Sequence, residues 1–349
     1  MISVLVVDDT ILYRKLVSEI IGSIPDVRVV GTASNGKIAL SRIALLKPDL
    51  VTLDVEMPEM NGIEVLKAAR KAGVGSAFLM VSALTKSGAA LSLRAIEAGA
   101  MDAIAKPDGV VVGRSEFEAD LKARIDAFVR KSRIRSILSA RGPSAPIADR
   151  LAEDRVKRPC EIVAVGVSTG GPAALLKVIP ALPADFRVSV LIAQHMPALF
   201  TDSLARSLDS RSRLAVKEGQ NGEVVLPGVV YIAPGGRHMR VDLGADAVTK
   251  ILRVTDDPPV NHCRPSVDYL FRSVALHYYG RALGVVMTGM GEDGAAGARE
   301  IRRSGGEVIV QDEESSVVWG MPGAVSARGD ADAAVRLDDL AAAISVRSR

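Results

Sequence analysis

The chain has 349 residues, a net charge of +3 at pH 7 and a hydrophobic share of 48%. This length suffices for about two domains with separate cores, and so small a charge excludes a protein built mainly to coat nucleic acid. No apolar run approaches the ~20 residues that a membrane-spanning helix needs. The first residues lack a basic segment before their apolar run, and the only cysteines, Cys160 and Cys263, lie far apart. We therefore expect a cytoplasmic protein without disulfides.

The first 128 residues alternate short apolar runs with amphipathic segments of helical length. Such runs are typical of strands buried on both faces of a parallel sheet, and the segments between them are typical of crossover helices. The pattern predicts a doubly wound α/β unit. Its expected strands are 2–7, 27–30, 50–53, 77–81 and 101–104, and two of its expected helices are 10–21 and 62–71.

Residues 122–158 are basic, with eleven Lys and Arg against four Asp and Glu. Two interpretations are open: a last helix followed by a solvated linker, or a patch that binds nucleic acid. We favour the linker and place the domain boundary here, because aromatic side chains for base stacking do not alternate with these charges. After it the alternation resumes and predicts a second α/β unit. Its expected strands are 161–167, 188–193, 229–233, 282–288 and 307–310, and expected helices include 172–179, 199–207 and 266–277.

Polar residues follow several strands of the first unit. Asp8 and Asp9 follow the first strand, and Asp54 ends the third. Carboxyl ends of parallel strands meet at the ligand-binding edge of a sheet, where these carboxylates would repel one another unless a cation such as Mg²⁺ joined them. Ser82 and Lys106 follow the next two strands and could bond phosphoryl oxygens. One such Asp alone is more often a helix N-cap, but the combination favours a phosphoryl site.

The segment Leu-Asp-Val-Glu-Met-Pro-Glu-Met-Asn-Gly at 53–62 closely resembles the phosphorylation loop of response-regulator receiver domains. The resemblance covers residues 1–125 and implies a flavodoxin-like fold. Receivers usually carry an aromatic residue three positions before the lysine, where this chain has Ala103, so we expect a different route from phosphate to surface. The implied roles are phosphoacceptor for Asp54, phosphate reading for Ser82 and Lys106, and Mg²⁺ ligation by Asp8 (through water), Asp9, Asp54 and the Glu56 carbonyl.

The second unit contains Gly-Val-Ser168-Thr-Gly, a G-x-S-x-G pattern between an expected strand and a helix start at Pro172. Its glycines let the chain turn sharply and present the Ser168 hydroxyl as a nucleophile. The same turn could instead cradle a phosphate or be purely structural. The turn alone leaves these three interpretations open.

A nucleophilic serine needs a base and a carboxylate. His195 follows a strand and should reach the same sheet edge as Ser168, which favours it as the base. His238 and His262, in Gly- or Pro-rich loops, remain possible as structural hydrogen-bonding residues or as substrate contacts, and His277 fits a helix surface. Asp293 also follows a strand, although on spacing alone an N-cap role for an expected helix 293–303 is the better interpretation. The order Ser, His, Asp differs from that of the α/β-hydrolases.

Five blocks resemble the catalytic domain of chemotaxis protein-glutamate methylesterases, the CheB family. They are Gly166–Pro172, Ala193–Pro197, Ile232–His238, Arg264–Asp268 and Thr288–Gly294. The resemblance implies a receiver at 1–125, a helix end and basic linker at 126–158 and a Rossmann-like methylesterase domain at 159–349. It also implies that Ser168 is the nucleophile, His195 the base and Asp293 the orienting acid, with oxyanion donors from the loops at Thr169 and Met290 and no cofactor for the ester reaction.

The implied activity is hydrolysis of glutamate methyl esters on the cytoplasmic domain of a chemoreceptor, with methanol released, and deamidation of receptor glutamines. The implied phosphodonor is a histidine kinase of the chemotaxis type, with no nucleic-acid partner and no membrane insertion. We expect the receiver to pack over the sheet edge that bears Ser168 and to exclude a large substrate until phosphorylation of Asp54 weakens this packing. A fragment from residue 155 onward should then be more active than the unphosphorylated chain. Two alternatives stay open: a second unit that only binds a partner or nucleic acid, and a hydrolase of another ester or amide.

Overall fold

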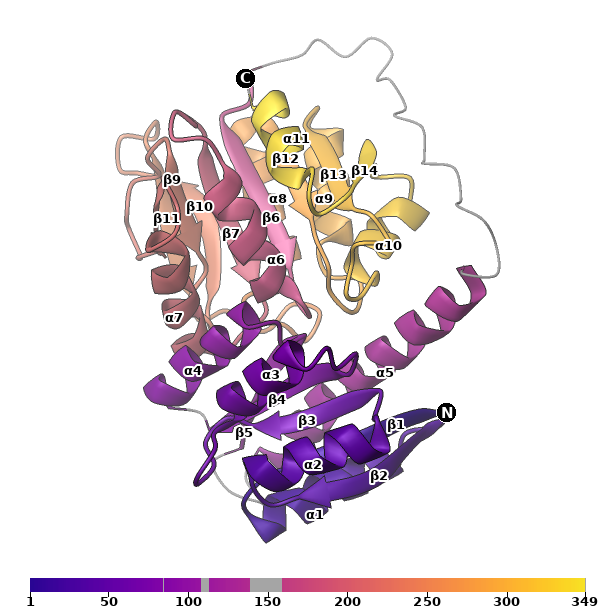
Figure 1. The fold of residues 1–349 in the computed structure, drawn as a ribbon. Helices are drawn as coiled ribbons and strands as arrows, with labels where there is room; N and C mark the ends of the chain where they lie inside the picture. Colours follow the sequence, from indigo (N-terminus) through magenta and orange to yellow (C-terminus); the bar gives the residue numbers. More distant parts are fainter. Residues whose placement is uncertain (84, 108–112, 139–158, 349) are drawn as a thin grey trace. The chain divides into compact units, whose positions relative to one another are not determined.

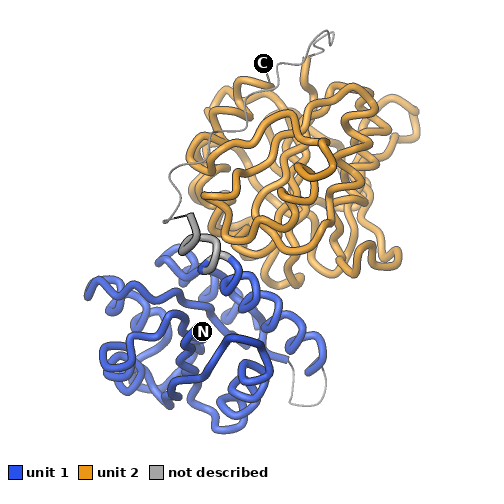
Figure 2. Tube along the Cα trace, turned by 90° about the vertical axis from the view of Figure 1, so that its right-hand side faces the viewer, with its two compact units in different colours: residues 1–142 blue, residues 143–349 orange. Residues whose placement is uncertain are grey.

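The computed structural model describes residues 1–83, 85–107, 113–138 and 159–348 (Figure 1). The chain divides into two compact units, Met1–Gly142 and Pro143–Arg349 (Figure 2). The basic segment expected as a helix end and linker begins within helix α5, which runs from Arg114 to Leu138, and its part at 139–158 lies outside the described residues. Within the described ranges, no helix is both long and apolar enough to cross a membrane.

The first unit is a five-stranded parallel sheet in the order β2-β1-β3-β4-β5, which confirms the predicted flavodoxin-like α/β arrangement. Helix α1 packs beside α5, whereas α2, α3 and α4 follow one another on the other face (Figure 1). The strands are β1 (Ile2–Val7), β2 (Val27–Ala33), β3 (Leu50–Asp54), β4 (Ala77–Ala83) and β5 (Asp102–Lys106). The helices before α5 are α1 (Ile11–Gly22), α2 (Gly36–Leu46), α3 (Gly62–Lys71) and α4 (Lys86–Glu97).

The loop after β3 is fixed by the start of α3, at the position that the sequence predicts. The Asn61 side chain accepts a hydrogen bond from the Glu64 N–H at 3.0 Å, and the Glu64 carboxylate accepts one from the Asn61 N–H at 2.9 Å. This reciprocal cap satisfies two amides that the first turn of a helix leaves unpaired. Gly62 is required because a Cβ there would collide with the Asp54 carbonyl oxygen. The loop is thereby held against the strand end that carries Asp54.

The second unit is a seven-stranded parallel sheet in the order β14-β13-β12-β6-β7-β9-β8, with a separate antiparallel hairpin, β10-β11. This confirms the second predicted α/β unit. Its strands are β6 (Ile162–Val167), β7 (Ser189–Gln194), β8 (Ala215–Glu218), β9 (Val229–Ile232), β10 (His238–Leu243), β11 (Lys250–Thr255), β12 (Ala282–Val286), β13 (Glu307–Gln311) and β14 (Ala333–Val335). Its helices are α6 (Gly171–Val178), the 3-10 turn η1 (Ile179–Ala181), α7 (Ala198–Asp209), α8 (Val267–Tyr278), α9 (Ala295–Arg303), α10 (Met321–Ala327) and α11 (Leu340–Arg347).

The hairpin corrects one expectation. His238, expected in a loop as a structural hydrogen-bonding residue or a substrate contact, begins β10 and is fully buried. Its Nε2 lies 3.1 Å from the Pro258 carbonyl oxygen, and its Nδ1 accepts a hydrogen bond from the Ser266 N–H at 3.3 Å. Burial lowers the pKa of this imidazole. His238 is therefore a structural hydrogen-bonding residue, with both ring nitrogens engaged.

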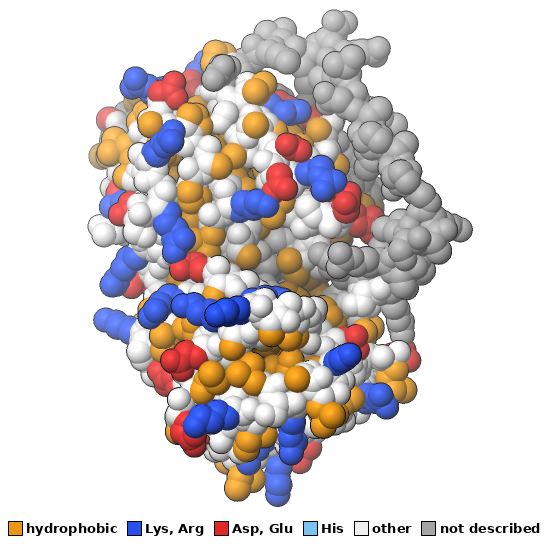
Figure 3. All heavy atoms as spheres, viewed as in Figure 1, with side chains coloured by type: hydrophobic (Ala, Val, Ile, Leu, Met, Phe, Trp, Pro, Cys, Tyr) orange, Lys and Arg blue, Asp and Glu red, His pale blue; other side chains and the backbone are white. Residues whose placement is uncertain are grey.

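The surface carries acidic and basic side chains side by side. On the face drawn in Figure 3, Lys and Arg are interspersed with Asp and Glu on each unit. Inside the second unit, the three central strands β12, β6 and β7 are buried along their whole length. The residues that follow these strands form the candidate active site.

Candidate active site

Ser168 directly follows the central strand β6. Its N–H donates to the Thr288 carbonyl at 3.0 Å, and its own carbonyl accepts from Gly171 at 2.8 Å, which closes a tight turn into α6. Gly170 has a φ of 75°, in the left-handed region that glycine adopts without strain. Gly166 has a different role: a Cβ there would collide with Val267, so this glycine lets the start of α8 pack against β6.

His195 follows β7, which pairs in parallel with β6. The His195 N–H donates to the Val167 carbonyl at 3.2 Å, and Gln194 Nε2 donates to the Ser168 carbonyl at 3.0 Å. These backbone-directed bonds tie the ends of the two strands together. His195 and Ser168 thus leave the sheet at the same edge, as the sequence predicts.

Asp293 comes from the other neighbour of β6, strand β12. It is buried, and its Oδ2 lies 2.9 Å from His195 Nε2. The N-cap interpretation is wrong for the helix that follows, because the cap of α9 is Gly294. The carboxylate instead holds the start of α8: Oδ2 accepts from Val267 N at 2.7 Å, and Oδ1 accepts from Asp268 N at 3.1 Å and from Ser266 Oγ at 2.9 Å.

These contacts set the charges of the pair. Burial works to raise the pKa of Asp293, but hydrogen bonds from His195, Asn261 and Val267 N lower it to about 2. Burial works to lower the pKa of His195, but its hydrogen bonds to Asp293 and Cys263 raise it to about 9. At neutral pH the resting pair is therefore an imidazolium and a carboxylate, and the ring must lose a proton before it can act as a base.

The Ser168 hydroxyl forms no hydrogen bond with His195 or with any other described residue. The ring nitrogen that Asp293 leaves free, Nδ1, lies 3.6 Å from Cys263 Sγ instead. The structure thus joins His195 to Asp293 and places Ser168 on the adjacent strand end. His262 is exposed on the turn beside Cys263, and His277 lies in the last turn of α8.

Two backbone N–H groups near Ser168 are available to a ligand. Neither Thr169 N nor Met290 N donates a hydrogen bond within the described ranges of the chain. Their loops are fastened together, since Thr288 Oγ1 donates to the Thr169 carbonyl at 2.9 Å. Backbone N–H groups without a partner beside a serine are the kind of donor that can stabilise an oxyanion.

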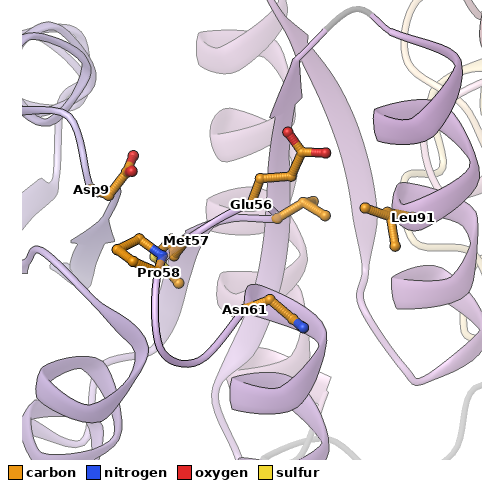
Figure 4. Close-up of a pocket in the computed structure, with 7 residues that line it drawn as sticks. Asp9, Glu56, Met57, Pro58, Asn61 and Leu91 are labelled. Atoms are coloured by element: carbon orange, nitrogen blue, oxygen red, sulfur yellow. The ribbon is translucent and has the colours of Figure 1, made fainter.

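The acidic cluster of the first unit lies where the sequence places it. Carboxylate oxygens of Asp8, Asp9 and Asp54 lie within 4.8 Å of one another, which fits a hard divalent cation such as Mg²⁺. Lys106 Nζ bridges Asp8 at 2.7 Å and Asp54 at 2.6 Å. A cavity of about 350 Å³ opens beside the cluster (Figure 4). Its lining comprises Asp9, Val55, Glu56, Met57, Pro58, Asn61 and Leu91.

Two buried groups, the Asp54 carboxyl and the Ser82 hydroxyl, have properties that suit the arrival of a phosphoryl group. Burial raises the pKa of Asp54 to about 6 against the opposing effect of Lys106. The Ser82 hydroxyl is fully buried and has no hydrogen-bond partner among the described residues. A buried polar group without a partner costs free energy, and a phosphoryl oxygen would satisfy it.

Sequence reasoning missed several residues at these sites. Tyr13 places its ring 4.9 Å from Lys106 Nζ and donates to the Pro107 carbonyl at 2.9 Å, so the lysine has an aromatic neighbour although Ala103 is small.

In the second unit, Asn261 and Cys263 contact the His195–Asp293 pair. Asn261 belongs to a residue type that is common in tight turns, and this was the available signal for these two residues.

Comparisons with known proteins agree with this geometry. The family model described as CheB methylesterase matches residues 163–344, and the response regulator receiver domain model matches residues 4–111. Two relatives, from Desulfotalea psychrophila and a Nocardioides strain, are named protein-glutamate methylesterase/protein-glutamine glutaminase. They are 44% and 43% identical to this chain, each over 97% of its length, and the matches cover 96% and 93% of the relatives. The crystal structure of the Thermotoga maritima CheB methylesterase catalytic domain matches 54% of this chain and 99% of its own, with 39% identity and a TM-score of 0.52. The chain therefore belongs to the CheB methylesterase family and joins a response regulator receiver domain to a methylesterase domain.

Proposed function

We propose that this protein hydrolyses glutamate methyl esters on the cytoplasmic domain of a chemoreceptor, deamidates receptor glutamines, and does so under control of phosphorylation at Asp54. The observation that carries the proposal is the 2.9 Å contact between His195 Nε2 and Asp293 Oδ2 at the strand end beside Ser168. The names of the relatives support the substrate, a protein glutamate ester or glutamine. The expected role is adaptation in chemotaxis.

In the proposed acylation, Ser168 Oγ attacks the ester carbonyl carbon. The resting imidazolium first loses its Nδ1 proton to solvent; the Ser168 proton then passes to Nδ1, because Asp293 occupies Nε2. The carbonyl oxygen becomes an oxyanion, which the Thr169 and Met290 N–H groups stabilise. The intermediate then collapses: His195 returns the proton to the leaving methoxide, and methanol departs.

Deacylation repeats these steps with water. His195 takes a proton from water as it attacks the acyl-serine, and returns that proton to Ser168 Oγ when the bond breaks. The product is a glutamate carboxylate, which adds a negative charge to the receptor surface. With a glutamine substrate, the same sequence releases ammonia in place of methanol and leaves the same carboxylate.

In the first unit, Asp54 is the proposed phosphoacceptor for a chemotaxis-type histidine kinase. Asp8, Asp9, Asp54 and the Glu56 carbonyl would hold Mg²⁺, which supplies charge neutralisation for the incoming phosphoryl group. Lys106, now shared between Asp8 and Asp54, would move its hydrogen bonds to phosphoryl oxygens, and the Ser82 hydroxyl would gain its missing partner. We expect these changes to raise the activity of the second unit.

The deciding experiment measures methanol release from a methylated receptor by the full-length protein, with and without a small-molecule phosphodonor. Wild type should release methanol faster when phosphorylated, and Ser168→Ala should release none above background. Asp54→Asn should keep the basal rate but lose the stimulation. If wild type releases no methanol under either condition, the second unit is a binding module or a hydrolase of another substrate, and the proposal is wrong.

A further inference from the structure

The turn Val260–Cys263, here named the positioning turn, lies against both members of the His195–Asp293 pair. Its backbone is closed by two hydrogen bonds between Val260 and Cys263, at 2.9 and 3.2 Å. Asn261 and His262 between them have φ angles of 53° and 60°, the left-handed pair typical of a two-residue hairpin turn. So short and closed a turn fixes the side chains of Asn261 and Cys263 relative to each other.

Asn261 contacts the carboxylate of the pair. Its Nδ2 donates to Asp293 Oδ1 at 2.8 Å and to Asp268 Oδ2 at 2.9 Å. The amide thus uses both hydrogens to hold two neighbouring carboxylates. Asp268 is itself anchored to α9, because its other oxygen accepts a hydrogen bond from Gly297 N at 2.7 Å. Asn261 therefore holds the Asp293 carboxylate toward His195 together with the hydrogen bonds from the start of α8.

Cys263 contacts the imidazole. Its sulfur lies 3.6 Å from Nδ1, while Asp293 engages Nε2. Nδ1 is the only ring nitrogen left to receive a proton from Ser168, so the sulfur occupies the position that the serine hydroxyl must take. Asp293 and Cys263 are the titratable groups that contact the ring among the described residues, and Asp268 stands behind Asn261.

We propose, on the basis of the function proposed above, that the positioning turn sets the resting state of the base: Asn261 orients Asp293, and Cys263 holds the His195 ring until Ser168 replaces it. The two residues act on the ring in opposite directions. Sulfur accepts a hydrogen bond from the protonated ring and so favours the imidazolium. The Asn261 amide draws charge from the Asp293 carboxylate and so weakens its attraction for the imidazolium.

Because Cys263 and Asn261 shift the pKa of His195 in opposite directions, replacing each of them tests the proposal. The chain has four histidines, so ¹⁵N-histidine NMR of the full-length protein can follow each ring, with assignments from single His→Gln variants. Cys263→Ala should lower the His195 pKa by about one unit, and Cys263→Ser, which keeps an acceptor, should lower it less. Asn261→Gly, which suits the left-handed φ, should raise that pKa by about half a unit. In a plot of the rate of methanol release against pH, the midpoint of the fall on the acid side should move with each shift of the His195 pKa.

His262→Asn is the matched control, because it keeps the turn geometry and replaces an exposed ring, and it should leave the His195 titration unchanged. If Cys263→Ala leaves that titration in place, or if Cys263→Ala and Asn261→Gly both lower it, the turn is only structural and the proposal is overturned. The signals of His238 and His277 report whether each variant is folded. If wild type released no methanol, the proposed function would be contradicted instead, and the His195 titration would still test the role of the positioning turn.

Discussion

Gly289 lies so close to Ser168 that a Cβ at position 289 would stand 2.8 Å from the Ser168 Cβ and 3.1 Å from its backbone nitrogen. Neither atom belongs to a flexible side-chain end, so Gly289→Ala must displace the Ser168 turn. We expect methanol release to fall at least about tenfold, since small misplacements of reacting groups are costly, and stability to fall by about 1–3 kcal/mol. Gly75→Ala, where a Cβ meets nothing within 4 Å, is the control. An unchanged rate in Gly289→Ala would contradict the close fit.

The His195–Asp293 pair should make stability depend on pH at both ends of the scale. The pKa of His195 is raised to about 9, so its contribution is complete below pH 6.5 and is lost as pH rises through 9. The pKa of Asp293 is lowered to about 2, so its contribution is complete above pH 3.8 and is lost as pH falls toward 2. Urea unfolding followed by Trp319, the only tryptophan, reports on the second unit.

In that measurement His195→Gln should flatten the decline in unfolding free energy between pH 6.5 and 9. Asp293→Asn should flatten the decline between pH 4 and 2 and also remove most of the alkaline slope, because it removes the main partner of the imidazolium. An alkaline slope that is equal in wild type and His195→Gln would show that other groups cause it.

Ser82→Ala should separate stability from signalling. The Ser82 hydroxyl is buried and has no partner in the described part of the chain, so its removal should leave the free energy of unfolding unchanged or raise it by about 1 kcal/mol. The same variant should lose most of the increase in methanol release that phosphorylation produces. Ser92→Ala in α4 also removes a buried hydroxyl that no described residue contacts by a hydrogen bond, and it should keep that increase. Equal stimulation in both variants would show that Ser82 does not read the phosphate.

Mg²⁺ should stabilise the first unit by binding the native carboxylates. Adding Mg²⁺ should raise the unfolding temperature of wild type, and chelation should reverse the increase. Asp9→Asn should weaken the effect, since Asp9 is the exposed member of the cluster and does not pair with Lys106. Differential scanning fluorimetry can compare the two proteins. A Mg²⁺ response of the same size in Asp9→Asn would place the cation elsewhere.

Much of this architecture follows from local sequence patterns. Strand ends in a parallel sheet converge on one edge, so Asp8, Asp54 and Lys106 could be brought together from their order alone, and so could Ser168 and His195. The α3 boundaries were predicted from the amphipathic stretch 62–71, and the cap formed by Asn61 and Glu64 fixes the start of the helix at that position. In each case the information lies within a few residues of the feature.

The rest depends on contacts between distant segments. That Asp293 holds the start of α8, or that Cys263 meets His195, follows from the packing of elements 26 and 68 residues apart. The hairpin β10-β11 was missed although β10 alternates in polarity, and this placed His238 in a loop. The role of Gly166 likewise depends on Val267, which only the folded chain brings near.

The His195–Asp293 contact is anchored by the first turn of α8 and needs nothing from a bound receptor. The pair therefore exists before any ester arrives. A small fluorophosphonate that captures reactive serines would then meet a preformed His195–Asp293 pair, and its labelling rate at Ser168 would depend on how readily Ser168 replaces Cys263 at His195 Nδ1 and on how readily molecules of a given size reach the site. Probes of increasing bulk could chart that access in cells, without a receptor substrate.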